Sequence, residues 1–318
     1  MSWKNWWRPS ICRQDPPSAS STSLDGETRT LRSFDCELPD PDADSQLEEK
    51  AENAAVRDFD VKRAELLGIR RRRMLHRMEP QSTSDTFPHV CQGESWDCGI
   101  ACIEMVYLWC CQSCRVDAFP LSAVRDWMVR FASTQSIWTV DLVILLQGLK
   151  DKLQLPINLL FCSDTLRVNT ALAALDYYQS TFDKDRKRVQ HRLQAVSKMN
   201  IPVHQGELRV DDLVAILSDD NAVAIVLVNN AMLMDQDVPG QLGRESCYTG
   251  HYLVLSGVSS NPQHVTACHD AWRENSPSWC FIAHNPASDE KVTFLNPVTL
   301  ELAWDSIGTD HDIIFIVK

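Results

Sequence analysis

The chain has 318 residues, of which 44% are hydrophobic, enough to fill the core of one large domain or two small ones. Its formal net charge of −12 argues against general affinity for nucleic acid or for an anionic membrane surface. The longest apolar run, residues 222–228, has the length of a strand, so the sequence predicts no transmembrane segment.

The 12 cysteines are expected to be free thiols. The N-terminal residues MSWKNWWR contain no apolar signal core, and disulfides are rare in proteins that stay inside the cell. We therefore predict a cytoplasmic protein. The basic run Arg70–Arg73 could be a nuclear-import signal or a site for an acidic partner, and in the first case the protein would also be found in the nucleus. Alternatively, the run is the solvated end of a helix.

Residues 1–84 are predicted to form a mostly disordered tail, because they are polar and show little periodicity. One charged helix is expected at about 44–78, where acidic residues come first and arginines last, as the helix dipole favours. Trp3, Trp6 and Trp7 stand out in this tail. They are either a site of partner binding or exposed residues of a disordered segment.

Residues 85–318 are predicted to form one α+β domain. Apolar spacing predicts a helix that starts near Cys98 and further helices at 118–132, 139–149, 171–199 and 210–217. Strands are expected at 157–162, 222–228, 251–258, 279–283, 291–295 and 313–317. The helix that carries Cys98 would then pack on a mostly antiparallel sheet, with 222–228 buried on both faces.

Cys98 is the candidate nucleophile. Asp97 has the residue type of a helix N-cap, and Gly99 allows a backbone or substrate to come close. A thiol in the first turn of a helix lies near free N–H groups and the positive end of the dipole, so we expect its pKa below the usual value of about 8.5. The amide of Gln92 and the N–H of Cys98 are the expected oxyanion donors.

His251 is the candidate general base, because it begins an apolar strand directly after a glycine. Asn285 follows a later strand, and its side chain can accept from the imidazole and fix the tautomer. The alternatives are a buried thiol, a structural histidine and a turn residue before Pro286.

Metal sites have only weak candidates. Cys110, Cys111 and Cys114 include a C-x-x-C pair without a second pair, which favours a loop with incidental thiols. His264, Cys268 and His269 lie in the insertion at 259–278, which is expected to be a polar loop. Asp310 and Asp312 either hold a divalent ion with waters or cap a turn.

Gln92 with Asp97-Cys98-Gly99-x-Ala101-Cys102 resembles the active-site box of papain-like cysteine peptidases, particularly the bacteriocin-processing branch. Together with SIWTVDL at 136–142, CYTGHY at 247–252 and GTDHD at 308–312, it resembles the guanylyl cyclase domain-containing family of soluble plant and animal proteins. The resemblance covers roughly residues 85–318. It implies a papain-like cysteine-peptidase-type fold, and relatives commonly have Asp where this chain has Asn285.

The residues favour a thiol hydrolase or peptidase of a small-molecule or peptide substrate, with Cys98, His251, Asn285 and Gln92 in the site and no cofactor. The family name implies instead a cyclase that makes cyclic GMP from GTP and needs Mg or Mn. For that reaction the basic cluster 184–188 is the only candidate clamp within the domain, and no G-x-x-x-x-G-K-[ST] loop is present. A binding scaffold without turnover is the third hypothesis.

Overall fold

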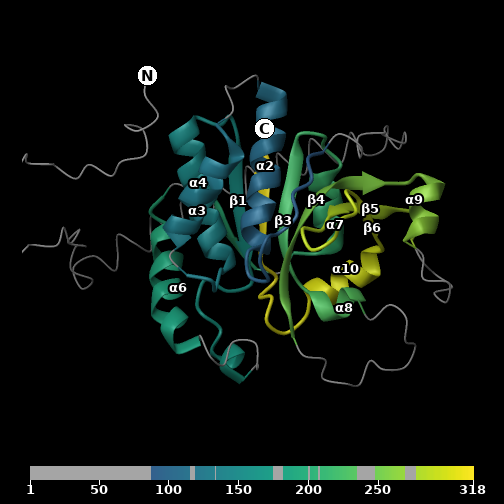
Figure 1. Cartoon of the computed structure of the whole chain (residues 1–318). Helices are drawn as coiled ribbons and strands as arrows, with labels where there is room; N and C mark the ends of the chain where they lie inside the picture. Colours follow the sequence, from purple (N-terminus) through teal and green to yellow (C-terminus); the bar gives the residue numbers. More distant parts are fainter. Residues whose placement is uncertain are drawn as a thin grey trace, which may run out of the picture. The chain divides into compact units, whose positions relative to one another are not determined.

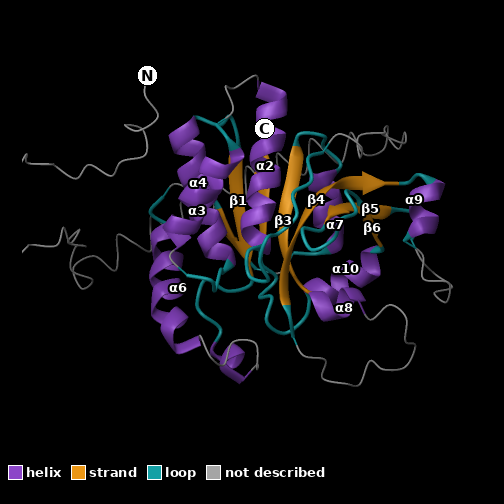
Figure 2. Ribbon diagram, in the orientation of Figure 1, coloured by secondary structure: helices purple, strands orange, loops and turns teal. Residues whose placement is uncertain are grey.

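Seven strands of the computed structural model form a single sheet in the order β2-β1-β7-β3-β4-β5-β6 (Figures 1 and 2). The strands are β1 (Asn158–Ser163), β2 (Val203–Gln205), β3 (Ala222–Asn229), β4 (Gly250–Ser259), β5 (Cys280–His284), β6 (Thr293–Leu295) and β7 (Ile313–Val317). β1 pairs with β2 in parallel, and the other neighbours pair antiparallel. The predicted α+β class with a mostly antiparallel sheet is confirmed.

The structure describes residues 87–114, 119–132, 134–174, 182–199, 201–206, 208–234, 248–268 and 277–318. All of them belong to one unit, Ala51–Lys318. The predicted tail 1–84, with its helix at about 44–78 and its tryptophans, lies outside the described residues. No helix among the described residues is both long enough and apolar enough to cross a membrane.

Helices cover both faces of the sheet. One face packs against α2 (Cys98–Cys114), α3 (Leu121–Ala132), α4 (Thr139–Leu153) and α6 (Phe182–Val196). The other packs against α7 (Val210–Leu217), α8 (Asn230–Met234) and α10 (Pro297–Trp304), and in Figure 1 α2 runs in front of the sheet. The short η3 (Thr170–Ala174) and α9 (Pro262–Ala267) complete the described elements.

β3 lies at the centre of the sheet and shows why both faces are covered. Its alternate side chains Val223, Ile225 and Leu227 lie in the core on the α2 side, and Ala224, Val226 and Val228 in the core on the α7 side. All eight of its residues are buried, which confirms that this strand is buried on both faces.

Several predicted elements differ from the structure. Within the expected helix 171–199, residues up to Ala174 belong to the 3-10 helix η3 instead, and α6 covers Phe182–Val196. The insertion at 259–278 was predicted as a polar loop, but it contains α9, whose N-cap Asn261 accepts a bond from Gln263 N–H. The C-x-x-C pair was predicted in a loop, and this is wrong because α2 continues to Cys114.

Helix α2 lies close to β4 and α4 at Gly99. A Cβ atom added there would lie 2.9 Å from both Cδ atoms of Leu142 and 3.1 Å from Cδ2 of Tyr252. Cys102, one turn later, is fully buried, as expected for a packing residue. The expected close approach at Gly99 is therefore between elements of the protein itself.

We expect Gly99→Ala to lower the free energy of unfolding by about 1–3 kcal/mol, because the added methyl overfills a packed contact. Urea unfolding of the wild type and variant measures it. Gly257→Ala is the matched control, since its Cβ would meet nothing closer than 3.7 Å. Equal losses in the two variants would contradict the packing argument.

Candidate functional site

The first turn of α2 presents Cys98, whose side chain is almost buried, at 6% exposed. Ala101 N–H donates to the Asp97 carbonyl at 3.0 Å, so Asp97 occupies the N-cap position. The side chain of Asp97 does not cap the helix as predicted. It accepts from the N–H groups of Gly93, at 3.3 Å, and Glu94, at 3.1 Å, and so holds the turn that precedes the thiol.

Arg125 of α3 fixes this turn from the side. It forms ion pairs with the buried carboxylates of Asp97 and of Glu104 on α2, the latter at 2.6 Å. Burial raises the pKa of Glu104 to about 7, although Arg125 opposes the shift. One guanidinium thus joins the turn before Cys98, helix α2 and helix α3.

Burial also favours the protonated form of the Cys98 thiol. It raises the pKa of Cys98 above its ordinary value, although hydrogen bonds from the backbone of Tyr252 and Gly99 lower it. The negative charge of Asp97 adds to the increase. The expectation of a lowered pKa is therefore wrong, because desolvation outweighs the N–H groups at the start of the helix.

His251 and Asn285 form the predicted pair, with the imidazole Nε2 and the amide Oδ1 2.8 Å apart. Because Oδ1 can only accept, Nε2 carries the proton and Nδ1 keeps its lone pair. Burial lowers the pKa of His251, and the hydrogen bond to Asn285 opposes this change. The resting imidazole is neutral, with Nδ1 able to accept a proton.

The Cys98 thiol contacts the backbone of the residue that follows His251, rather than the His251 imidazole itself. The Tyr252 backbone that hydrogen-bonds the Cys98 sulfur directly follows His251 on β4. No hydrogen bond joins the two side chains among the described residues, and alternation along β4 directs the imidazole away from the Tyr252 ring. The predicted partners are adjacent but not in direct contact.

Gln92 lies beside the Asn285 turn, because its backbone N–H donates to the Pro286 carbonyl at 2.8 Å. Its side-chain Nε2 donates to the Glu94 carbonyl at 2.9 Å, and its Oε1 is buried without a hydrogen-bond partner. In this conformation the amide does not serve as the predicted oxyanion donor.

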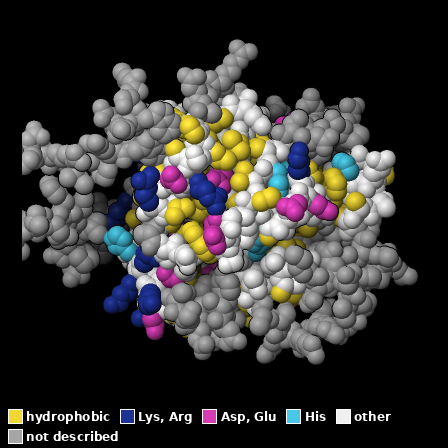
Figure 3. All heavy atoms as spheres, in the orientation of Figure 1, with side chains coloured by type: hydrophobic (Ala, Val, Ile, Leu, Met, Phe, Trp, Pro, Cys, Tyr) yellow, Lys and Arg dark blue, Asp and Glu magenta, His cyan; other side chains and the backbone are white. Residues whose placement is uncertain are grey.

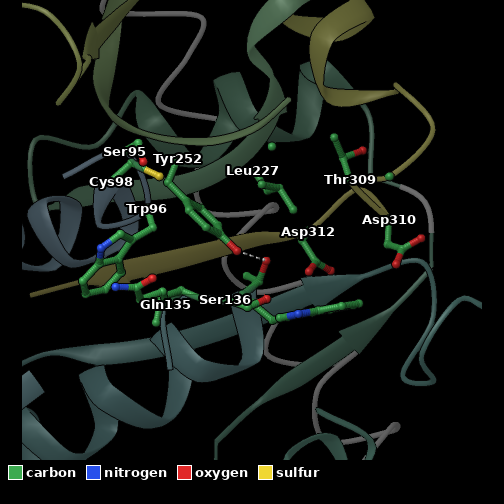
Figure 4. Close-up of a pocket in the computed structure, with 15 residues that line it drawn as sticks. Ser95, Trp96, Cys98, Gln135, Ser136, Leu227, Tyr252, Thr309, Asp310 and Asp312 are labelled. Atoms are coloured by element: carbon green, nitrogen blue, oxygen red, sulfur yellow. Dashed lines mark hydrogen bonds between the residues drawn. The ribbon is translucent and has the colours of Figure 1, made fainter. Parts of the chain in front are cut away.

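A pocket opens next to Cys98 and brings together the separate sequence motifs (Figure 4). Its free space for water-sized molecules is about 50 Å³. The pocket is lined by Ser95, Trp96, Cys98, Gln135, Ser136, Ile137, Trp138, Thr139, Leu227, Gly250, Tyr252, Gly308, Thr309, Asp310 and Asp312. His251, Asn285 and Gln92 are not among the lining residues.

Two hydrogen bonds hold the motifs together at this pocket. The hydroxyls of Thr139 and Tyr252 lie 3.0 Å apart, and Tyr248 OH donates to the Gly308 carbonyl at 2.8 Å. Gly308 has φ of +109°, and a Cβ atom there would lie 2.8 Å from the Tyr248 ring. Neither Thr139 nor Tyr252 was predicted to belong to the site, although both lie in the motifs that carry the family resemblance.

Asp312 lies at the far side of the pocket from Cys98 in Figure 4. Burial raises its pKa to about 8, with smaller increases from Asp310 and Asp164, while hydrogen bonds with Thr139 and Ser163 lower it. Asp310 adopts a positive φ of 49° and accepts from Asn169 Nδ2 at 2.9 Å. Its backbone carbonyl accepts from Asp164 N–H at 3.0 Å, as expected of a turn residue.

Metal-ligand clusters are not found among the described residues, within which no three His, Cys, Asp or Glu side chains are suitably grouped. His264 stacks on Phe294 with centroids 4.1 Å apart, and Cys268 hydrogen-bonds the Val265 carbonyl. His269 lies outside the described residues.

The basic cluster 184–188 does not line the pocket. Arg188 binds both carboxylate oxygens of Asp141 at 2.7 Å and the Ser136 carbonyl at 3.0 Å. The Asp141 carboxylate also accepts from Trp138 N–H at 2.9 Å, so it satisfies the backbone N–H of the residue that precedes α4. The other basic residues of the cluster, Lys184, Arg186 and Lys187, are exposed on α6, and Figure 3 shows basic side chains at the surface in this region.

Comparison with known proteins gives one consistent result. A family model described as "Guanylylate cyclase" matches residues 87–316. "Guanylyl cyclase 1" of Arabidopsis thaliana is 29% identical over 242 residues, which cover 74% of this chain and 77% of the plant protein. No solved structure matches the chain.

We expect Asp312→Asn to raise the melting temperature at pH 8, because it removes a carboxylate that is costly to ionise in place. Between pH 4 and 8 the wild-type native state retains a proton that the unfolded state has lost, so wild-type stability falls as pH rises. The advantage of the variant should therefore shrink towards pH 4. Melting curves at pH 4, 6 and 8 measure it, and a difference independent of pH would contradict it.

Proposed function

Because the chain belongs to the guanylylate cyclase family, its activity has to be inferred within that family, and we propose thiol-dependent hydrolysis or transfer of an acyl group. Cys98 would be the nucleophile, His251 the general base and Asn285 the residue that orients it. The observation that carries the proposal is the 2.8 Å hydrogen bond between His251 Nε2 and Asn285 Oδ1. His251 directly precedes Tyr252, whose backbone hydrogen-bonds the Cys98 sulfur.

In this mechanism the Cys98 sulfur attacks an acyl carbon while Nδ1 of His251 accepts the thiol proton. The raised pKa of Cys98 and the lowered pKa of His251 mean that both groups rest neutral, so proton transfer accompanies attack. The leaving group then takes the proton from Nδ1, and water hydrolyses the thioester. No hydrogen bond joins the pair among the described residues, and the imidazole is directed away from the Tyr252 ring. The proposed transfer therefore requires reorientation of the imidazole or a bridging water when substrate binds.

The oxyanion would be stabilised by backbone N–H groups at the start of α2, with the Gln92 amide as a second donor. Gln92 is suitably tethered, since its backbone is bound to Pro286 next to Asn285. Its amide would have to leave the Glu94 carbonyl to take this role. The buried Oε1 without a partner makes that rotation less costly.

A second candidate is formation of cyclic GMP from GTP, which the family description and the name of the Arabidopsis relative favour. That chemistry requires metal ions or cationic side chains around a triphosphate. The Cys98 pocket has two aspartates and no Lys or Arg in its lining, and Arg188 is bound to Asp141. Geometry therefore favours the thiol hypothesis.

Substitutions at the thiol site test the proposal. We expect Cys98→Ala to abolish turnover of an ester, amide and peptide library and Cys98→Ser to lower it by several orders of magnitude. His251→Ala should lower it about 10²–10⁴-fold. Cys91→Ala is the control, because Cys91 is an exposed thiol outside the pocket lining. Activity that survives Cys98→Ala would refute the role of this thiol.

The cyclase candidate predicts a different pattern. We expect cyclic GMP formation from GTP with magnesium or manganese to be slow or absent, and any trace to survive Cys98→Ala, because cyclisation needs no thiol. Robust, metal-dependent formation that is lost in an Asp310→Asn, Asp312→Asn double variant would favour the cyclase. Mass spectrometry of the nucleotide product distinguishes these outcomes, with Asp211→Asn, a change at an exposed residue of α7, as control.

A further inference from the structure

The Cys98 pocket contains one carboxylate, Asp312, for which the described part of the chain supplies no cationic partner. The buried carboxylates of the described domain are paired with arginine: Asp97 and Glu104 with Arg125, Asp141 with Arg188 and Arg192, and Asp185 with Arg188. Among the residues that the structure describes, Asp312 forms no ion pair, and its side chain hydrogen-bonds those of Thr139 and Ser163. Asp312 is partly exposed and lines the pocket, so a positive charge bound there could reach and stabilise its carboxylate.

The surroundings of Asp312 add negative charge. Asp310 and Asp164 both raise its pKa, and none of the fifteen residues that line the pocket is Lys, Arg or His. Two basic residues of this region, His311 and Arg167, lie outside that lining. His311 bonds Asp164 and Asp305, and Arg167 borders an adjoining cavity that Asp310 and Asp312 also line.

The shape of the pocket connects this carboxylate to the thiol. In Figure 4 the Cys98 sulfur lies near one end and Asp312 near the other, with the Tyr252 ring between them. Trp138 and Tyr252 supply aromatic surface, which attracts cations through the ring quadrupole. Space of about 50 Å³ admits a group of only a few heavy atoms.

We propose that this pocket is a specificity pocket for a positively charged group of the substrate, a primary amine or a guanidinium on a short chain, and that Asp312 is its counter-ion. The inference rests on the proposed function, in which the acyl group is bound at Cys98. A cation would pair with the Asp312 carboxylate and favour its ionised form, while Trp138 and Tyr252 contact the aliphatic part of the chain. Substrates with an acidic group in this position would be rejected by Asp310 and Asp312.

Charge-matched alkylating reagents test the pocket without knowledge of the substrate. Cys98 would be labelled at pH 8 with 2-bromoethylammonium, iodoacetamide and iodoacetate, and each rate divided by that of the neutral thiol N-acetylcysteine amide. We expect the normalised ratio of the cationic to the anionic reagent at Cys98 to be about tenfold or more, as a single desolvated charge pair gives. Asp312→Asn should bring this ratio close to one, and Asp211→Asn should leave it unchanged.

A measurement on the wild type alone covers the case in which Asp312→Asn does not fold. Propylammonium ions should protect Cys98 from iodoacetamide, whereas propanol of the same size should not. A normalised ratio near one, or equal protection by the two compounds, would overturn the inference while Cys98 remains a candidate nucleophile. Labelling of Cys98 no faster than that of the fully buried Cys280 with every reagent would overturn both the inference and the proposed function.

Discussion

The close contact between the first turn of α2 and strand β4 determines the geometry of the candidate site. Gly99 makes this contact possible, because the Cβ atom of any larger residue would lie too close to the side chains of Leu142 and Tyr252. The approach brings the Cys98 sulfur against the backbone of Tyr252 and buries it. The same packing that places the thiol beside the strand of His251 therefore also removes it from water and raises its pKa.

Charge is distributed unevenly across this domain, and the distribution separates structural from functional groups. Arginines on α3 and α6 pair with buried carboxylates at the starts of α2 and α4, so the turns before both helices are fixed by ion pairs with low exposure. Such pairs are costly to break, because removal of one partner leaves a buried charge uncompensated. Asp312 differs, because its partners among the described residues are the side chains of Thr139 and Ser163 and no arginine.

The sequence predicted what local patterns determine. The class of the domain, the limits of α7 and β7, the double burial of β3 and the His251–Asn285 pair all follow from apolar spacing and from residue types at strand ends. The sign of the Cys98 pKa shift could not be predicted, because it depends on how deeply the thiol is buried by segments distant in the chain. The role of Asp97 was missed for the same reason, since Arg125 lies 28 residues away and draws its carboxylate from the helix end.

The family relationship concerns the whole domain, whereas the proposed chemistry concerns the residues of one site. The family match covers residues 87–316, almost the whole described domain, and so it concerns the fold as well as any single reaction. Activity depends on the site, and one fold commonly supports several chemistries. A nucleotide cyclase must neutralise a triphosphate, whereas a thiol hydrolase needs a nucleophile, a base and a pocket for one side chain. In the thiol chemistry that we propose, the small acidic pocket beside the buried Cys98 would hold one side chain of the substrate.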